Sequence, residues 1–252
     1  MDGYGVVVSG GSSGLGAAVV RRFHERGAQV TIADVNSAAG AELAGELGER
    51  STFVACDVRH EDQVAAAVAQ AATAPAGLRV AVACAGVGVV EAILGHGRTV
   101  HRQESFEATL AVNLVGSFNV LRIAARAIAE TSPEEDGARG VVVLTSSLSG
   151  IEGAPGEVAY AASKAGVVGM VLPAARELAA VGIRVNAIAP GAFDTPMMDG
   201  MSDPLKAGYV QGIPFPKRFG RPEEFAALVE HVVSNRVVNG ATLRIDGGAR
   251  HR

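Results

Sequence analysis

Short runs of β-branched and other apolar residues alternate along the chain with longer segments in which apolar residues recur every three or four positions. The short runs predict strands, and the longer, Ala-rich segments predict helices. Strands are expected near residues 5–9, 29–33, 52–56, 79–84, 140–146, 183–189 and 241–245. Helices are expected near 14–26, 37–47, 61–73, 104–130, 157–180 and 222–234, with a shorter one near 203–210. The alternation predicts an α/β fold, a Rossmann-type doubly wound parallel sheet of about seven strands with helices on both faces.

Composition narrows the class of protein. The 252 residues are 48% hydrophobic, which is enough for one substantial core, so we expect a single domain over residues 1–252. A net charge of -4 offers no broad basic surface, so nucleic acid is not an expected partner. There is no charged-then-apolar leader, and no apolar run approaches the roughly 18 residues of a membrane span, so we expect a cytoplasmic protein. Cys56 and Cys84 give neither a disulfide framework nor metal-ligand spacing, and no metal site is expected.

A glycine-rich turn follows the first predicted strand in VVVSGGSSGLG. Gly10, Gly14 and Gly16 stand at the junction with the first helix, where glycine permits a tight turn and close approach of a pyrophosphate to the helix N-terminus. Ser12 and Ser13 can add hydroxyl donors. Because the turn lies between a strand and a helix, the segment predicts a dinucleotide site.

Asp34 ends the second predicted strand, where a carboxylate can accept hydrogen bonds from the adenosine ribose. The same charge would repel a 2′-phosphate, and neither Val35, Asn36 nor the serine turn is a cation that could offset it. NAD is therefore favoured over NADP. The alternative is that Asp34 is only the N-cap of the next helix.

Polar or small residues also end the next two strands. Asp57 and Val58 follow the third, where a carboxylate can meet the adenine amino group. Cys84 and Gly86 follow the fourth, where a short thiol side chain and a glycine let the backbone approach a ribose.

Tyr160 and Lys164 stand four positions apart near the start of a predicted helix, so their side chains lie one turn apart on one face. An ammonium nearby favours the phenolate and is expected to lower the pKa of Tyr160. Ser147, at the end of the run VVVLTSS, can hold the same substrate oxygen by its hydroxyl. The three residues predict proton transfer at one C–O group, although YxxxK alone is more often a surface pair on a helix.

The segment 192–220 follows the sixth strand, and its Gly, Pro and Met content predicts a movable lid over an apolar substrate. Met197, Met198, Met201 and Phe215 are candidates to line the site, and plain packing is an equally good interpretation of each.

Taken in order, these features resemble a short-chain dehydrogenase/reductase from end to end. The resemblance rests on the Gly turn, Asp57, Cys-Ala-Gly at 84–86, Asn113 in AVNLVG, Ser147, Tyr160, Lys164 and PGAFDTP. Within that family the chain resembles most the type-2 3-hydroxyacyl-CoA dehydrogenases, by the same Cys-Ala-Gly, the long segment before the fourth helix, LPAARELA and GRPEEFAALVEHVV.

The resemblance implies the roles of individual residues. Cofactor contacts are implied for Ser13, Leu15, Asp34, Asp57, Val58, Cys84, Tyr160, Lys164, Phe193 and Thr195. Ser147 is implied as a substrate contact, and Lys164 as the residue that binds the nicotinamide ribose. Asn113 is implied to hold a water that relays protons to Lys164. The resemblance also implies a homotetramer, with apolar faces of 104–130 and 157–180 and the strand 241–246 as candidate interfaces.

The function that these features favour is NAD-dependent interconversion of a secondary alcohol and a ketone, foremost 3-hydroxyacyl-CoA and 3-oxoacyl-CoA. Cations in segments 87–103 and 192–220 are expected to flank the cleft mouth and meet the coenzyme A phosphates: Arg98, His101, Arg102, Lys206, Lys217 and Arg218. The alternatives are a hydroxysteroid dehydrogenase, a 3-oxoacyl-carrier-protein reductase, which usually requires NADPH, and a dinucleotide-binding scaffold without turnover.

Overall fold

The computed structural model describes residues 1–250 and contains one seven-stranded sheet in which every neighbouring pair is parallel. The strands are β1 (Gly5–Ser9), β2 (Gln29–Asp34), β3 (Ser51–Ala55), β4 (Leu78–Ala83), β5 (Gly140–Thr145), β6 (Ile183–Pro190) and β7 (Thr242–Ile245). Their order in the sheet is β3-β2-β1-β4-β5-β6-β7. The predicted doubly wound sheet is confirmed, and each strand lies within one residue of its predicted bounds.

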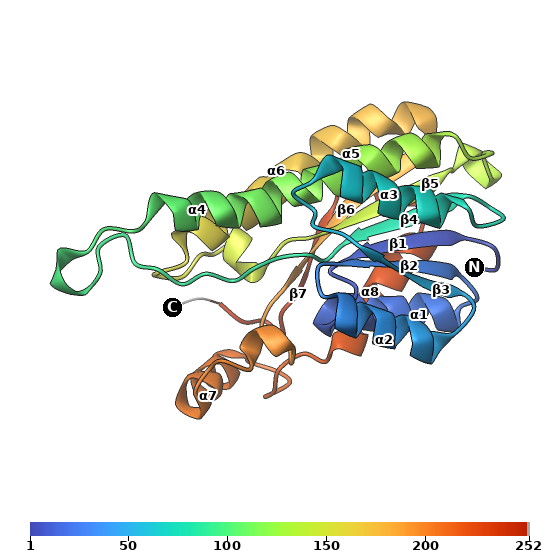
Figure 1. Ribbon diagram of the computed structural model, residues 1–252. Coiled ribbons are helices and arrows are strands. Elements are labelled where there is room, and N and C mark those ends of the chain that lie inside the picture. The colour runs from blue at the N-terminus through green and yellow to red at the C-terminus, as the bar shows by residue number, and fades with distance from the viewer. Residues whose placement is uncertain (251–252) are drawn as a thin grey trace.

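Helices cover both faces of the sheet (Figure 1). They are α1 (Gly14–Glu25), α2 (Ser37–Leu47), α3 (Glu61–Ala72), α4 (Gln103–Leu110), α5 (Gly116–Ala129), α6 (Val158–Leu178), α7 (Asp203–Gly212) and α8 (Pro222–Ser234). One core lies between the sheet and α3, α5 and α6, and the other between the sheet and α1, α2 and α8. Alternation along the strands supplies both cores, since Val6 and Val8 face one layer and Val7 the other.

The long helix predicted over 104–130 is interrupted. A π-helical segment, Ala111–Val115, separates α4 from α5. Within it the backbone carbonyl of Asn113 accepts a hydrogen bond of 2.6 Å from the Ser117 hydroxyl. The hydroxyl thus competes with the backbone N–H groups that would otherwise donate to this carbonyl in an α-helix. Single π-helical turns inside α-helices often mark functional sites, and Asn113 is a predicted site residue.

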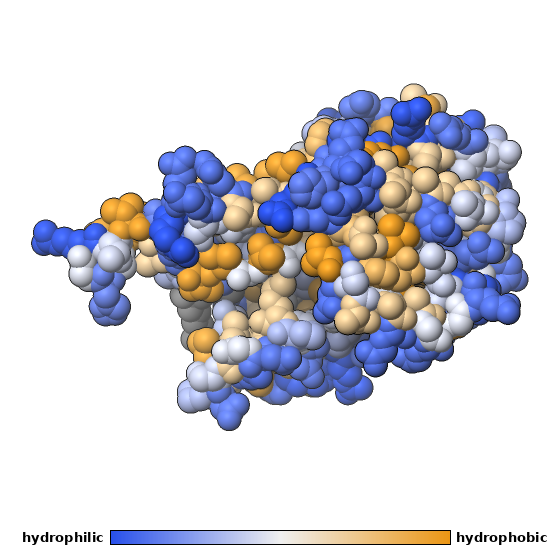
Figure 2. Space-filling model, in the orientation of Figure 1, coloured by the Kyte–Doolittle hydropathy of each residue, from blue (hydrophilic) through white to orange (hydrophobic). Residues whose placement is uncertain are grey.

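Two long segments leave the layered body on the same side of the molecule (Figure 1). The first, residues 86–102 between β4 and α4, is called the arm; its only regular pairing among described residues is a bridge between Leu94 and Val100. The second is the predicted lid, 192–220, which carries α7 and a 3₁₀ turn, Pro196–Met198. Figure 2 shows apolar side chains along the hollow between these two segments.

Two helical stretches, Gln103–Ala129 and Val158–Val181, are long and apolar enough to cross a membrane by length and composition. Both pack on the sheet, because α5 and α6 contribute to one of its cores. Their outward faces keep exposed apolar side chains, among them Val115, Phe118 and Leu172.

Candidate active site

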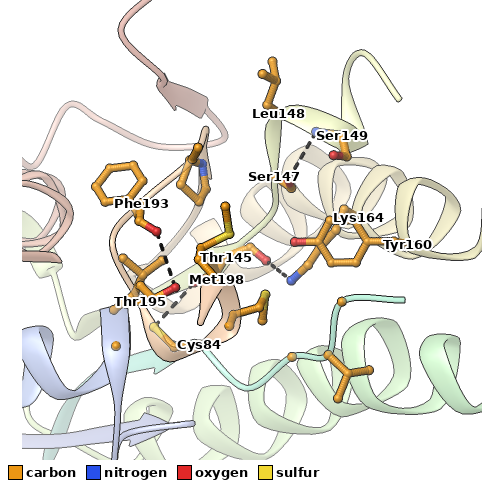
Figure 3. A pocket seen from close by; sticks show the side chains of 18 of the residues that line it. Cys84, Thr145, Ser147, Leu148, Ser149, Tyr160, Lys164, Phe193, Thr195 and Met198 are labelled. Carbon is orange, nitrogen blue, oxygen red and sulfur yellow. Dashed lines mark hydrogen bonds between the residues drawn. The ribbon is translucent and has the colours of Figure 1, made fainter. Parts of the chain in front are cut away.

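A cleft of about 1180 Å³ lies at the carboxyl edge of the sheet, where β1 and β4 are neighbours and the strand order reverses. Ligands of open α/β sheets bind at such a switch point. The glycine-rich turn, the segments after β2 to β6, the arm and the lid all contribute to its walls. Figure 3 shows Ser147, Tyr160 and Lys164 on the right of the pocket, with Phe193 and Thr195 facing them from the left.

The glycine-rich turn has the geometry that its sequence predicts. Gly10 has φ +66°, and a Cβ there would lie 2.6 Å from the backbone nitrogen of Ala85. A Cβ on Gly16 would overlap the carbonyl oxygen of Gly10, so the first turn of α1 can approach β1 only with glycine. Ser13 is the N-cap of α1 and makes no side-chain cap hydrogen bond, and Gly10, Ser13, Gly14, Leu15 and Gly16 line the cleft. The N-terminus of α1 is thus a cradle suited to phosphate.

Ser12 does not line the cleft, although a hydroxyl donor was predicted there. Its backbone N–H instead donates to Asp34 Oδ2 at 3.0 Å. Ser12 therefore ties the turn to the end of β2.

Asp34 lines the cleft, with each carboxylate oxygen accepting one backbone hydrogen bond, from Ser12 and from Asn36. The helix cap is a different residue: Asn36 is the N-cap of α2, and its side chain accepts from Ala39 N–H at 3.2 Å. Asp34 is therefore free of the capping role that was the alternative interpretation, and its oxygens keep lone pairs for a ligand.

Asp57 and Val58 also line the cleft. The Asp57 carboxylate is already engaged, since Arg59 Nε lies 3.0 Å and 2.9 Å from its two oxygens. This hydrogen bond lowers the pKa of Asp57. Val58 is fixed by its carbonyl, which accepts from Asn119 Nδ2 at 2.9 Å. Arg59 lies two positions beyond the predicted acid and was not itself predicted as a site residue.

Cys84 and Gly86 lie where the arm leaves β4. The thiol accepts a hydrogen bond from Thr145 Oγ1 at 3.5 Å, and burial raises its pKa to about 11, so it stays a neutral packing group. A Cβ on Gly86 would come within 3.2 Å of Asn113 Oδ1 and 3.4 Å of Lys164 Nζ. The absence of a side chain at Gly86 therefore keeps the space beside the ammonium open.

Ser147, Tyr160 and Lys164 meet at one end of the cleft. Ser147 emerges just after β5 and accepts a hydrogen bond from Ser149 N–H at 3.1 Å. Lys164 Nζ lies 5.8 Å from the centre of the Tyr160 ring and donates to the Thr145 carbonyl at 2.9 Å. The predicted convergence of the three side chains is present in the structure (Figure 3).

The electrostatics of this triad differ from the expectation that Lys164 lowers the pKa of Tyr160. Burial raises the pKa of Tyr160, a hydrogen bond with Ser147 opposes that rise, and the charge of Glu157 adds to it. Lys164 is 4% exposed, and burial lowers its own pKa to about 8. The expectation fails because burial, the largest influence on each group, disfavours both the phenolate and the ammonium.

Asn113 is fully buried and does not line the cleft. Its side chain accepts from Val87 N–H at 2.8 Å and donates to the Val87 carbonyl and to Ser163 Oγ, each at 3.0 Å. Asn113 therefore fastens the start of the arm to α6, the helix that carries Tyr160 and Lys164.

The lid closes the cleft opposite the catalytic helix. Phe193 is buried and packs edge to face on Phe225, with ring centroids 6.3 Å apart. A Cβ on Gly14 would lie 3.2 Å from Thr195, and one on Gly88 would lie 3.4 Å from Met197 Sδ, so the lid meets both the turn and the arm. The three predicted methionines of the lid line the cleft, whereas Phe215 is 81% exposed and does not.

The six cations expected at the cleft mouth do not line it. Arg102 forms an ion pair with Glu91 of the arm, and Arg218 forms one with Glu224 of α8, the helix that follows the lid. Among residues 1–250, the cations that do line it, besides Lys164, are Arg59 and Arg250. Arg250 reaches it because the chain after β7 returns to the mouth, which no local pattern indicates.

Two further residues line the cleft: Glu157, the N-cap of α6 and about one turn before Tyr160, and Tyr209 of α7. Helical spacing alone could have identified Glu157, because positions three apart share a face. Tyr209 gives no such signal, since the lid places it.

The chain is similar along its whole length to proteins of known name. A family model described as enoyl-(acyl carrier protein) reductase matches residues 10–250. The 3-hydroxyacyl-CoA dehydrogenase type-2 of Drosophila melanogaster is 42% identical over 245 residues, which cover 97% of this chain and 96% of that protein. The crystal structure of 3-hydroxyacyl-CoA dehydrogenase type-2 from Mycobacterium avium matches with a TM-score of 0.94 and 43% identity, covering 99% of this chain and 97% of the other. The 3-oxoacyl-[acyl-carrier protein] reductase from Brucella melitensis ATCC 23457 matches with a TM-score of 0.86 and 31% identity, covering 100% and 92%.

Proposed function

The chain belongs to the short-chain dehydrogenase/reductase family, and from that premise we propose that it is an NAD-dependent oxidoreductase interconverting 3-hydroxyacyl-CoA and 3-oxoacyl-CoA. The observation that carries the proposal is the shared cleft. Ser147, Tyr160 and Lys164 open into the same space as the N-terminus of α1 and Asp34. The proton-transfer group and the dinucleotide site therefore face the same space, where both can act on one substrate.

The residues present fit a nicotinamide dinucleotide. Gly10 and Gly16 let the turn pack closely on its neighbours, because a Cβ at either position would strike backbone. This packing brings the N-terminus of α1 to the cleft, where a pyrophosphate can bind. The adenosine end would lie near Asp34, Asp57 and Val58, and the nicotinamide end near Cys84, Gly86, Lys164, Phe193 and Thr195. When bound, the dinucleotide accepts or supplies the hydride that no side chain of the protein can.

Asp34 favours NAD over NADP. A ribose hydroxyl can donate to its carboxylate, whereas a 2′-phosphate would meet a like charge. Arg59 is the nearest lining cation on this side, and its guanidinium is held by Asp57.

In oxidation, the Ser147 hydroxyl holds the substrate oxygen and Tyr160 takes its proton. In reduction, the Tyr160 phenol returns that proton, and its raised pKa keeps the phenol protonated at neutral pH. Lys164 supplies positive charge beside the ring and would bind the nicotinamide ribose.

Asn113 acts as a positioning residue in this scheme. Its amide is committed to Val87 and Ser163, so it holds the Gly86 backbone beside Lys164. The water that the family resemblance assigns to Asn113 remains part of the proposal.

The substrate assignment rests on the 3-hydroxyacyl-CoA dehydrogenase type-2 relatives and on the apolar wall of Val89, Val90, Met197, Met198, Met201 and Leu205. Reduction of 3-oxoacyl chains on a carrier protein is the second candidate, favoured by the 31% identical reductase and disfavoured by Asp34. A hydroxysteroid is a further candidate, since an apolar cleft of this size suits it.

We also propose a cytoplasmic homotetramer. Val115 at the end of the π-helical segment, Phe118 on α5 and Leu172 on α6 are each nearly half exposed. These stretches therefore offer apolar surface to a second copy of the chain. Sedimentation equilibrium tests this point.

The decisive experiment is an activity panel. Formation of NADH or NADPH is measured with 3-hydroxyacyl-CoA esters, hydroxysteroids, sugar alcohols and 3-hydroxyacyl-carrier protein. The proposal expects the highest kcat/KM with NAD and an acyl-CoA ester. Preference for NADP with the carrier-bound substrate would select the reductase, and turnover of none of them would leave a dinucleotide-binding scaffold.

A further inference from the structure

Helix α6 and its N-cap residue present three ionisable side chains to the cleft: Glu157 at the N-cap, then Tyr160 and Lys164 in the helix. They are spaced three and four positions apart, so they form one stripe along the helix. Tyr160 lies about one turn after Glu157 and about one turn before Lys164. The reacting tyrosine therefore lies between a potential cation and a carboxylate.

The two ends of this stripe face different parts of the cleft. Lys164 points toward the dinucleotide end, where its ammonium is held by the Thr145 carbonyl and lies next to Gly86. Glu157 lines the cleft together with Tyr209 of the lid helix α7. Burial raises the pKa of Tyr209 and of Tyr160, and the charge of Glu157 adds to both rises. Glu157 is thus on the substrate side of the reacting group.

Glu157 also makes fewer hydrogen bonds through its carboxylate than the other two acids that line the cleft. Of the carboxylates lining the cleft, Asp34 accepts two backbone hydrogen bonds and Asp57 is clamped by Arg59. Glu157 accepts a hydrogen bond of 3.3 Å from Ala154 N–H. Arg250 also lines the cleft, but it shares Glu152 and Asp246 with Arg244, so those four charges cancel.

We propose that Glu157 is a specificity-determining residue that rejects substrates with a free carboxylate near the reacting carbon and admits neutral esters and thioesters. This inference rests on the proposed function. In a 3-hydroxy acid the carboxyl carbon is two bonds from the reacting carbon, so an ionised acid places a second negative charge beside Glu157. In a thioester the same carbon is neutral, and the coenzyme A phosphates lie far away at the mouth.

The expected effect follows from Coulomb's law. Two unit charges about 6 Å apart, at an effective dielectric constant between about 20 and 80, repel enough to change binding by about 3- to 100-fold. A discrimination of about tenfold against the free acid is therefore expected from Glu157 alone.

The test compares 3-hydroxybutyrate with its N-acetylcysteamine thioester as substrates of the full-length enzyme. The ratio of kcat/KM values, acid over thioester, is measured at low ionic strength for the wild type, E157Q and E157D. The inference predicts that E157Q raises the ratio about tenfold and that E157D, which keeps the charge, stays near the wild-type ratio. E177Q is the matched control: the same change on the exposed face of α6, outside the cleft, with the wild-type ratio expected.

The outcomes separate the inference from the proposed function. An unchanged ratio in E157Q, with the thioester turned over, overturns the role of Glu157 and leaves the function intact. If the enzyme oxidises a different neutral alcohol and not the thioester, the proposed function fails. The ratio for that alcohol and its carboxylate analogue then supports or overturns the role of Glu157 in the same way.

Discussion

The two ends of the cleft are built in different ways. At the dinucleotide end, short turns after β1 and β2 place Gly10, Gly16 and Asp34, and backbone contacts fix each position. At the substrate end, the arm and the lid are long connections with apolar side chains left in solvent, such as Val90 at 73% and Phe215 at 81% exposure. The difference teaches that cofactor binding and substrate binding are separable in this protein. Only the stripe of Glu157, Tyr160 and Lys164 extends from one end of the cleft to the other.

Tyr160→Phe should give the largest loss, because it removes the proton-transfer group that serves both ends and leaves the ring in place. We expect kcat to fall by roughly 10²–10⁴ while the Kd for NAD changes less than about threefold. Stopped-flow turnover and a fluorescence titration with NADH measure the two quantities. A variant with near-normal kcat would remove Tyr160 from the mechanism, and a large change in Kd would break the separation of the two ends.

Lys164→Met should remove activity and yet stabilise the fold. Burial lowers the pKa of Lys164 from 10.5 to about 8. Below pH 8 the folded protein therefore holds a buried ammonium, which is less favourable than the hydrated ammonium of the unfolded chain. This pKa shift corresponds to a destabilisation of about 3 kcal/mol, which the variant removes. The variant also loses the hydrogen bond to Thr145, which costs about 1 kcal/mol of stability. We expect the free energy of unfolding to rise by about 2 kcal/mol at pH 7.

The pH dependence of that gain checks its cause. The unfavourable contribution of Lys164 is complete below about pH 8 and is relieved as the pH rises from there toward 10.5, so the advantage of the variant should shrink over that range. Urea unfolding at pH 7 and pH 9.5 measures it. Lys217→Met is the control, since Lys217 is exposed and also donates to a carbonyl. Equal stability of the Lys164 variant and wild type at pH 7 would contradict the prediction.

Asp34→Ala should act on the dinucleotide end alone. The change deletes a charged acceptor for the ribose, which we expect to weaken NAD about tenfold and to admit NADP. At saturating NAD the KM for the alcohol should stay as in the wild type. Asp34→Asn keeps an acceptor without the charge and should lose less affinity for NAD. Comparable wild-type efficiency with NAD and NADP would reject the role of Asp34.

The contrast between the two ends also explains which parts of the site the sequence could predict. Gly10 and Gly16 follow from a strand-turn-helix pattern, since the turn permits no side chain there. Ser147, Tyr160 and Lys164 follow from helical spacing and the end of a strand. In these cases the chain within some 20 residues determines the geometry.

The remaining errors arise where distant segments meet. Phe215 is apolar and lies in the lid, but the fold turns it to solvent, whereas Tyr209 of the same segment lines the cleft. The pKa of Tyr160 depends on burial, which spacing does not reveal. Arg250 was missed because it lies far along the chain from the cleft residues that it approaches.

Arg250 provides the smallest and last test, at the substrate end. It lines the cleft, and its side chain is 56% accessible. Arg59, the other exposed cation that lines the cleft in the part of the chain that the structure describes, is held by Asp57. Its partners, Glu152 and Asp246, are also held by Arg244, so Arg250 can turn toward a phosphate without leaving either acid unpaired. It is therefore the residue expected to meet the phosphates of coenzyme A.

Arg250→Gln should raise the KM for a 3-hydroxyacyl-CoA about two- to fivefold, because an exposed ion pair contributes at most about 1 kcal/mol. The KM for the pantetheine-truncated thioester should not change, since it lacks the adenosine phosphates. Raising the salt concentration should shrink the difference between variant and wild type, as screening weakens exposed charges. Lys206→Gln, a cation of α7 that does not line the cleft, is the matched control and should leave both KM values unchanged. If the Arg250 change raised the KM of both substrates equally, Arg250 would act by holding the C-terminal segment in place and not by binding phosphate. The cleft would then recognise coenzyme A by its apolar wall alone.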